Sequence, residues 1–226
     1  MTNRFTALET ERLLLRRLQE PDLATFLAYR NNDPEVARYQ DWEGYTEAEA
    51  RGMIQPMGRE EPFVPGEWFQ FGVELKGSGK PVGDLGFRIT EDGRQGEVGY
   101  ILAREHWGKG YATESVSRLL DHAFGVLGLH RVYAIVGQEN ASSAAVLERI
   151  GLRREGAFVE NAWFKGRWSS EFLYATLLIG VARARRWAGV GPALARVVGG
   201  ADAIGRPRPG RPGYASRLVM TCLMRV

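Results

Sequence analysis

The chain has 226 residues, 44% of them hydrophobic and 25% charged, which are ordinary values for one globular domain with or without an appendage. This composition excludes a fibrous repeat and a wholly disordered chain. Cys222 is the only cysteine, which excludes a disulfide framework, and with three histidines (His106, His122 and His130) the sequence predicts no metal centre.

The net charge of +3 combines two regions of opposite sign. Residues 181–226 hold nine arginines and one acid, Asp202, and are rich in Ala, Gly and Pro, so we expect a largely disordered extension there. Residues 1–180, the expected folded domain, hold the other 21 basic and 26 acidic side chains, and this acidic body favours cationic partners over nucleic acid. Without a signal-peptide pattern or an apolar run of roughly 18 residues, we expect a cytoplasmic protein with no membrane partner.

The first third of the chain predicts one strand and two helices. Residues 12–17 are a short, branched apolar run typical of a strand. Apolar residues at helical spacing from Leu23 predict a helix that residues 31–34 (NNDP) end. Thr46, with Glu49 three residues later, predicts a second helix that stops near Pro56, before a loop over 58–66.

The rest of the folded part changes from strands alone to alternating strands and helices. Glycine-rich turns separate three strand-like segments, which predict an antiparallel meander over 68–75, 82–89 and 97–102. An amphipathic helix over 111–127, a strand over 131–136, a helix over 142–150 and strands over 153–159 and 168–178 follow. This order predicts a mixed α/β sheet with helices on its faces.

A glycine loop joins the strand at 97–102 to the helix at 111–127. Gly108 and Gly110 let a ligand approach the backbone, Lys109 adds positive charge, and the first helical turn leaves N–H groups unpaired. The loop therefore suits a diphosphate. It lacks the Gly-Lys-Ser/Thr of the phosphate loop and the third glycine of the dinucleotide fingerprint, so a simple turn remains the alternative.

A second polar segment follows the strand at 131–136. Asn140 stands where that strand has just ended, so its amide could reach into the space beside the strand. Ser143 lies three residues later, in the first turn of the next helix. As an alternative, Asn140 caps that helix and contacts no ligand.

Together these segments resemble the GNAT superfamily of acetyl-CoA-dependent N-acetyltransferases, most closely its RimJ/RimL-like branch, over roughly residues 8 to 180. The motifs that carry the resemblance are Glu97-Val98-Gly99-Tyr100, Trp107-Gly108-Lys109-Gly110-Tyr111-Ala112-Thr113-Glu114 and Asn140-x-x-Ser143-x-x-Val146-Leu147-Glu148-x-x-Gly151-Leu152. Gly156 and the Gly166-x-x-x-x-Glu171 hairpin also match.

The resemblance implies a mixed, mostly antiparallel sheet of about seven strands with about four helices, splayed between the fourth and fifth strands, here 97–102 and 131–136. Acetyl-CoA would enter that gap, with backbone N–H groups near Ile101 and Leu102 facing the thioester carbonyl. The implied coenzyme-binding residues are Tyr100, Ile101, Leu102, Trp107, Gly108, Lys109, Gly110, Tyr111, Ala112, Thr113, Asn140 and Ser143.

The same resemblance suggests catalytic residues for transfer to an amine. Glu97 would be the general base, with a water-mediated base as an equal alternative and Asp84 and Glu160 as weaker ones. Many members carry a tyrosine where this chain has Leu147, so Ser143 would instead hydrogen-bond the departing thiolate. A second departure is Glu105, where many members open the loop with Gln or Arg.

The acceptor is less well defined than the donor. Trp42, Glu43, Trp163 and Phe164 fall in the two regions that line acceptor grooves in this family, although aromatic residues there often only pack. A protein N-terminus, an aminoglycoside-like amine and a polyamine all fit an acidic body, in a monomer or homodimer. The alternatives are a non-catalytic acyl-CoA sensor on the same fold and, less favoured because aromatics are sparse in its arginine-rich segment, a nucleic-acid-binding protein.

Overall fold

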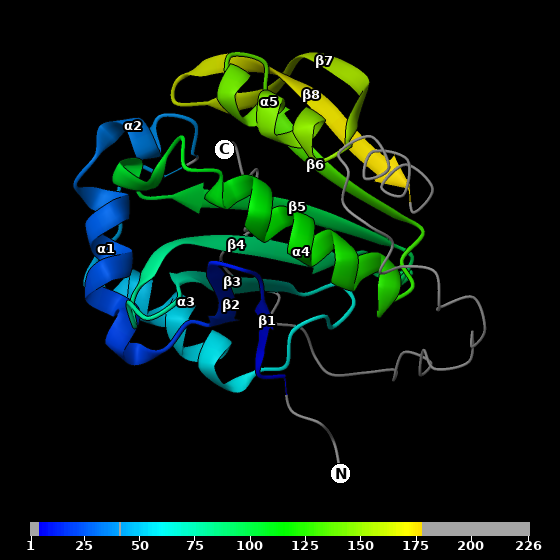
Figure 1. Cartoon of the computed structure of the whole chain (residues 1–226). Helices are drawn as coiled ribbons and strands as arrows, with labels where there is room; N and C mark the ends of the chain where they lie inside the picture. Colours follow the sequence, from blue (N-terminus) through cyan, green and yellow to red (C-terminus); the bar gives the residue numbers. More distant parts are fainter. Residues whose placement is uncertain (1–4, 41, 178–226) are drawn as a thin grey trace.

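The computed structural model describes residues 5–40 and 42–177, so the expected disordered extension at 181–226 lies outside the described residues. One sheet runs through the described part in the order β1-β2-β3-β4-β5-β6-β8-β7 (Figure 1). All neighbouring strands pair antiparallel except β5 and β6, which are parallel. The strands are β1 Ala7–Glu9, β2 Leu13–Arg17, β3 Trp68–Leu75, β4 Pro81–Ile89, β5 Gln95–Leu102, β6 Arg131–Gly137, β7 Arg153–Phe164 and β8 Arg167–Leu177.

The helices cover both faces of the sheet. Their bounds are α1 Leu23–Asn31, α2 Pro34–Ala37, α3 Glu47–Arg59, α4 Tyr111–Gly125 and α5 Ala141–Arg149. One apolar core joins α4 and α5 to the strands through fully buried side chains such as Leu119 and Leu147. A second core, around Phe26 and Ile54, packs α1 and α3 against the opposite face.

The predicted mixed α/β sheet is confirmed, with two elements more than expected. The described residues form eight strands and five helices rather than about seven and four. The additional strand is β1, three residues that pair with β2. The additional helix is α2, which begins at Pro34 and is capped by Asp33, whose side chain accepts a hydrogen bond from the Glu35 N–H at 2.9 Å.

Two predicted boundaries are wrong. The helix expected to stop near Pro56 continues to Arg59, and the Glu60 N–H closes its last turn on the Pro56 carbonyl at 2.8 Å. Proline removes one hydrogen bond, and so close to a helix end little is lost. The strand expected to end at 159 continues to Phe164, because two shifts of register let β7 follow β8 further around a bend.

The parallel pair β5 and β6 separates along its length, as the splayed sheet requires. Pairing is confined to Gln95–Glu97 on β5 and Arg131–Tyr133 on β6. Beyond it, β5 continues to Leu102 beside β4, while β6 continues to Gly137 beside β8 (Figure 1). The gap that opens between them lies next to the start of α4 and the start of α5.

Candidate functional site

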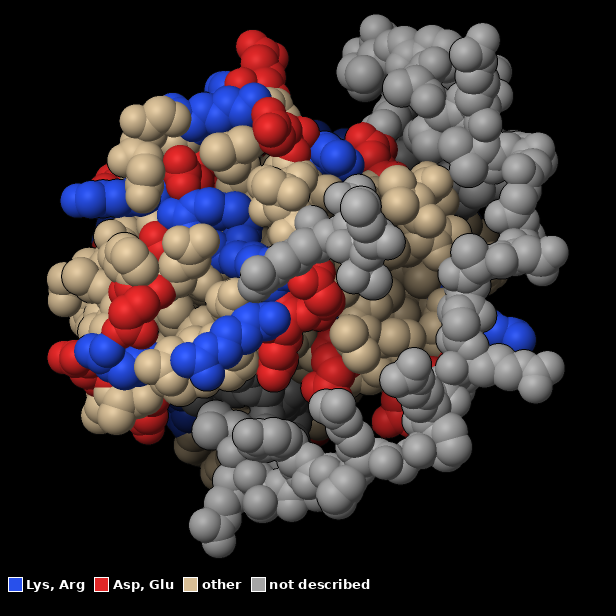
Figure 2. Space-filling view, turned by 90° about the horizontal axis from the view of Figure 1, so that it is seen from below, with Lys and Arg blue, Asp and Glu red and all other residues tan. Residues whose placement is uncertain are grey.

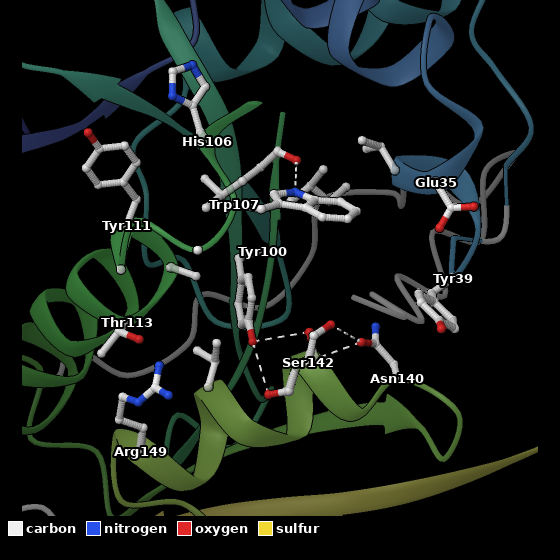
Figure 3. A pocket seen from close by; sticks show the side chains of 18 of the residues that line it. Glu35, Tyr39, Tyr100, His106, Trp107, Tyr111, Thr113, Asn140, Ser142 and Arg149 are labelled. Carbon is white, nitrogen blue, oxygen red and sulfur yellow. Dashed lines mark hydrogen bonds between the residues drawn. The ribbon is translucent and has the colours of Figure 1, made fainter. Parts of the chain in front are cut away.

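A cavity of about 260 Å³ lies beside the end of β5, where β5 and β6 no longer pair (Figure 3). Its walls come from the end of β5, the glycine loop and first turn of α4, one face of α5, and α2 with the residues that follow it. The lining residues are Glu35, Val36, Tyr39, Gln40, Tyr100, Ile101, Leu102, His106, Trp107, Gly108, Gly110, Tyr111, Ala112, Thr113, Asn140, Ser142, Ser143, Val146 and Arg149. Eleven of the twelve predicted coenzyme residues are among them, and Lys109 is not.

The edge of β5 determines which backbone groups face the cavity. The Ala103 N–H donates to the Val82 carbonyl at 2.9 Å, so alternate residues of β5, including Ile101, turn their N–H toward β4. The other residues of β5, including Tyr100 and Leu102, turn their backbone N–H groups toward the gap. Of the N–H groups expected near Ile101 and Leu102, that of Leu102 therefore faces the gap and that of Ile101 does not. The Leu102 carbonyl accepts a hydrogen bond from the Trp107 indole N–H at 2.8 Å.

The glycine loop forms the end of the cavity at α4. Gly108 and Gly110 have φ angles of +71° and +81°, a left-handed backbone that glycine adopts without strain. A Cβ built on Gly108 meets no atom within 4 Å, so the backbone there is open to a ligand. The Thr113 Oγ1 atom is buried without a hydrogen-bond partner, and it lies in the same first turn of α4 as the helix's unpaired N–H groups. These donors fit an anionic group such as a diphosphate.

The start of α5 forms the wall opposite the glycine loop. The Asn140 side chain accepts a hydrogen bond from the Ser143 N–H at 3.1 Å, so Asn140 does cap the helix, as its alternative interpretation held. It also lines the cavity, and the two roles coexist. The Tyr100 hydroxyl donates to Ser143 Oγ at 3.3 Å from across the cavity. Burial raises the pKa of Tyr100 and outweighs the opposing effect of its contact with Ser143, so the phenol stays protonated.

Glu97 lies on β5 but not in the cavity. It stands in the part of β5 that pairs with β6, opposite Tyr133. Its carboxylate accepts hydrogen bonds from Arg88 at 2.7 Å and from the Tyr133 hydroxyl at 3.1 Å. Burial raises the pKa of Glu97, and the Arg88 charge and these hydrogen bonds only partly offset that effect. Proton transfer between Glu97 and a ligand in the cavity would have to pass through water.

The two weaker candidate bases also lie outside the cavity. Asp84 is completely buried on β4, where Arg30 donates to it at 2.7 Å and Tyr29 and Gln70 donate as well. Since all these partners hold its charge in place, Asp84 is a structural anion. Glu160 is exposed at a bend of β7.

The residues expected at the acceptor groove do not line the cavity. Trp42 packs beside Tyr45, with the Arg30 guanidinium 5.1 Å from its ring, and Glu43 is exposed. Trp163 is 63% exposed on β7 and Phe164 is buried at the end of that strand. The lining residues on this side instead come from α2 and the turn after it, at Glu35, Val36, Tyr39 and Gln40.

The sequence signal for this wall was the pair Asp33-Pro34. It was interpreted as the end of one helix, although Asp followed by Pro also starts helices. On α5, the lining residues Val146 and Arg149 follow Ser143 at helical spacing, a pattern that extends the predicted face.

The charges around the site are mixed rather than uniformly acidic. Figure 2 shows another face of the molecule, seen from below, where acidic and basic side chains are also interspersed. Among the described lining residues Glu35 supplies the carboxylate, and His106 and Arg149 are the basic side chains. Preference for a cationic ligand would therefore have to arise locally, at Glu35.

Within 5–40 and 42–177, no group of three or more His, Cys, Asp or Glu side chains is arranged to hold a metal ion. The helices in the same ranges are all too short or too polar to cross a bilayer.

Comparison with known proteins identifies relatives of the described domain. The family model of the acetyltransferase (GNAT) domain matches residues 12–153, more than half of the chain. The uncharacterized N-acetyltransferase p20 of Bacillus licheniformis is 34% identical over 172 residues, 75% of this chain and 95% of that protein. Spermidine N-acetyltransferase of Vibrio cholerae, solved with CoA and spermine, is 26% identical with a TM-score of 0.65 and covers 76% of this chain and 99% of its own. RimJ of Mycobacterium smegmatis, solved with CoA-disulfide, is 26% identical with a TM-score of 0.64 and covers 78% of this chain and 89% of its own.

Proposed function

Since the chain belongs to the GNAT acetyltransferase family, we propose that it transfers an acetyl group from acetyl-CoA to a primary amine of a cationic acceptor, in the manner of the RimJ/RimL-like branch. One observation carries the proposal: a single cavity joins the anion-binding glycine loop, the gap between β5 and β6, and the carboxylate of Glu35 on α2. A donor with an anionic end and an acceptor with a cationic end can therefore meet inside it.

The donor half of the proposal rests on the α4 side of the cavity. The N–H groups of the first turn, the open backbone at Gly108 and the unpaired Thr113 hydroxyl suit the pyrophosphate of acetyl-CoA. The edge of β5 offers its N–H groups at Tyr100 and Leu102 to a chain lying in the gap. The thioester carbonyl would accept a hydrogen bond from one of them, which stabilises the oxygen as it becomes an oxyanion.

The reaction requires a proton to leave the acceptor and charge to be stabilised on sulfur. The amine nitrogen attacks the thioester carbonyl carbon, so a C–N bond forms and the C–S bond breaks with its electron pair on sulfur. We assign stabilisation of that thiolate to the Ser143 hydroxyl, because Leu147 has no proton to give. We assign the nitrogen's proton to water in the cavity, with Glu97 as the terminal base, since a raised pKa makes its carboxylate a better proton acceptor.

The acceptor half rests on Glu35. As a carboxylate in the cavity wall, it can hold an ammonium or guanidinium group of the acceptor near the amine that reacts. A polyamine, an aminoglycoside-like amine and a protein N-terminus beside a basic residue all meet that requirement. The similarity to a spermidine acetyltransferase supports a polyamine as the acceptor, and the similarity to RimJ supports a protein N-terminus.

The test is thiol release from acetyl-CoA over a panel of amines, with mass detection of the acetylated product. The panel should contain spermidine, an aminoglycoside, short peptides with free N-termini, and each amine's acetylated form as a blank. We expect release only with free amines, and faster release with cationic than with neutral ones. Thermal stabilisation by CoA without thiol release for any amine would instead favour a non-catalytic acyl-CoA sensor.

A further inference from the structure

Resting on the function proposed above, we propose that Tyr100 is a positioning residue that acts through Ser143: its hydroxyl donates to Ser143 Oγ and so directs the serine's own hydrogen at the thiol sulfur of CoA. The two hydroxyls would form a donor chain that replaces the tyrosine many family members carry at the position of Leu147.

The proposed chain of two hydroxyl donors rests on the contacts between Tyr100 on β5 and Ser143 on α5. The Tyr100 hydroxyl lies 3.3 Å from Ser143 Oγ and 3.4 Å from the Ser143 carbonyl oxygen (Figure 3). Both distances are longer than the usual O–H···O range. Such lengths fit a phenol hydrogen that is shared between two acceptors, the Oγ and the carbonyl oxygen of Ser143. Such catalytic hydrogen bonds commonly shorten only once a ligand is bound.

The direction of donation follows from what each oxygen has around it. The Ser143 N–H is used by the Asn140 side chain, and Ser143 Oγ accepts from Tyr100. Among the described residues no acceptor takes the hydrogen of the Ser143 hydroxyl, which therefore is free to point into the cavity. A hydroxyl that accepts one hydrogen bond becomes a stronger donor in the next, so Tyr100 strengthens whatever bond Ser143 makes.

Burial makes Tyr100 suited to this role and unsuited to giving up its proton. Its side chain is 4% exposed, and burial raises its pKa, so the phenol remains a donor throughout the pH range in which an amine reacts. Ser143 is also 4% exposed, so a thiolate bonded to it would lie in a site from which most water is excluded. There, a donor chain stabilises the developing negative charge more than it would in water.

Leu147 explains why the hydroxyl donor that assists Ser143 has to come from outside α5. Its side chain is 2% exposed and packs in the same apolar cluster as Tyr100, one turn of α5 beyond Ser143. No proton donor can come from that position. The Tyr100 phenol reaches the start of α5 from the opposite wall instead. The other titratable or charged residues that line the described cavity do not hydrogen-bond Ser143; they are Glu35, Tyr39, His106, Tyr111 and Arg149.

The experiment measures the pKa of the CoA thiol in the enzyme complex. The thiolate absorbance of bound CoA is titrated against pH, with the S-methyl-CoA complex subtracted as a reference that has no thiol. The variants are Tyr100→Phe, Ser143→Ala and the double variant. Tyr174→Phe is the matched control, because it is an equally buried tyrosine in the same cluster whose hydroxyl bonds Glu148, at 3.0 Å, outside the cavity.

We expect the wild type and the control to lower the thiol pKa below that of free CoA by about one unit, the size of one hydrogen bond to a charged group. Ser143→Ala should abolish this shift, Tyr100→Phe should remove about half of it, and the double variant should match Ser143→Ala. In turnover, Tyr100→Phe should lower kcat by about tenfold with the KM for acetyl-CoA unchanged.

Three outcomes overturn the inference in different ways. If CoA binds and acetyl transfer occurs, but Tyr100→Phe leaves both the thiol pKa and kcat at wild-type values, Tyr100 does not act through Ser143 and the proposed function stands. If the effects of the two single variants add, the residues act separately and the donor chain is wrong. If CoA does not bind to the wild type, the proposed function fails and this inference fails with it.

Discussion

Arg12 and Glu114, which are 102 residues apart in the sequence, join the start of β2 to the first turn of α4. The Glu114 carboxylate accepts from the Arg12 backbone N–H at 2.9 Å and from its guanidinium at 2.6 Å. The same guanidinium donates to the Lys109 carbonyl at 3.0 Å and lies 4.7 Å from the centre of the Tyr111 ring. Arg12 therefore holds the glycine loop against the sheet without lining the cavity itself.

Replacing Arg12 by alanine should weaken acetyl-CoA binding because the loop loses the anchor that fixes its backbone N–H groups. We expect a dissociation constant about tenfold higher, and a loss of stability of no more than about 1 kcal/mol because the Arg12 side chain is 43% exposed. Calorimetric titration measures the dissociation constant for acetyl-CoA, and denaturant unfolding measures the stability. Arg51→Ala is the control, since the Arg51 side chain is about as exposed as that of Arg12 and its ion pairs with Glu20 and Glu47 lie away from the cavity. Equal acetyl-CoA affinity in the two variants would contradict the anchoring role.

Glu97→Gln should remove the acid limb of the pH profile of kcat/KM, because that limb reports ionisation of the terminal base. Affinity for acetyl-CoA should be unchanged, since Glu97 does not line the cavity. Glu35→Gln provides the comparison: it should raise the KM for cationic amines about tenfold and leave the acid limb in place. A pH profile unmoved in Glu97→Gln would mean that the proton passes to solvent without that carboxylate.

The same Glu97 variant should change how stability depends on pH. Burial raises the pKa of Glu97 above its unfolded value, with the Arg88 charge and hydrogen bonds opposing. The folded state is then favoured most below the unfolded pKa, and that advantage disappears as pH rises through the folded pKa. Relative to wild type, Glu97→Gln should therefore gain stability as pH rises from about 4, near the unfolded pKa, through the raised folded pKa of Glu97. Denaturant unfolding across that range measures it, and a constant difference would mean that the pKa of Glu97 is not raised.

Asp84→Asn should destabilise the fold strongly, by about 3 to 5 kcal/mol, because it leaves the Arg30 guanidinium buried without a counter-charge. Arg30 is 2% exposed and Asp84 is completely buried, so water cannot replace the lost partner. Denaturant unfolding measures the loss, with Glu20→Gln as a control that breaks the exposed ion pair between Glu20 and Arg51 and should change stability little. A loss as small as the control's would mean that the buried pair contributes no net stability.

The residues that line the cavity on the α4 side could be predicted from sequence because their signals are local. The segment 107–114 contains the glycines, the helix start and the polar residues of the loop within one short run, and periodicity placed the helix behind it. The strands of the meander were predictable for a similar reason, since turn residues bound each of them. Even here Lys109 was misjudged, because nothing in a sequence shows which way a loop side chain points.

The acceptor half could not be predicted because it depends on contacts between distant segments. Trp42 was expected at a groove and instead packs over the buried Arg30, a residue that Asp84 on β4 neutralises. Glu35 entered the cavity through a helix of four residues, too short for any periodicity to show. Glu97 shares β5 with the lining residues, and only the pairing of β5 with β6 reveals that the sheet has not yet opened at that point.

The most direct test of the central claim, that the gap beside the glycine loop binds acetyl-CoA, compares Gly108→Ala with Gly128→Ala. The two glycines have φ angles of +71° and +66°, and a Cβ on either meets no atom within 4 Å, but only Gly108 lines the cavity. Both variants should lose about 1 kcal/mol of stability from the strained backbone. Calorimetric titration should show acetyl-CoA binding to the wild type and Gly128→Ala with equal affinity and at least tenfold more weakly to Gly108→Ala. Equal affinity in all three proteins, or no binding to the wild type, would contradict the claim.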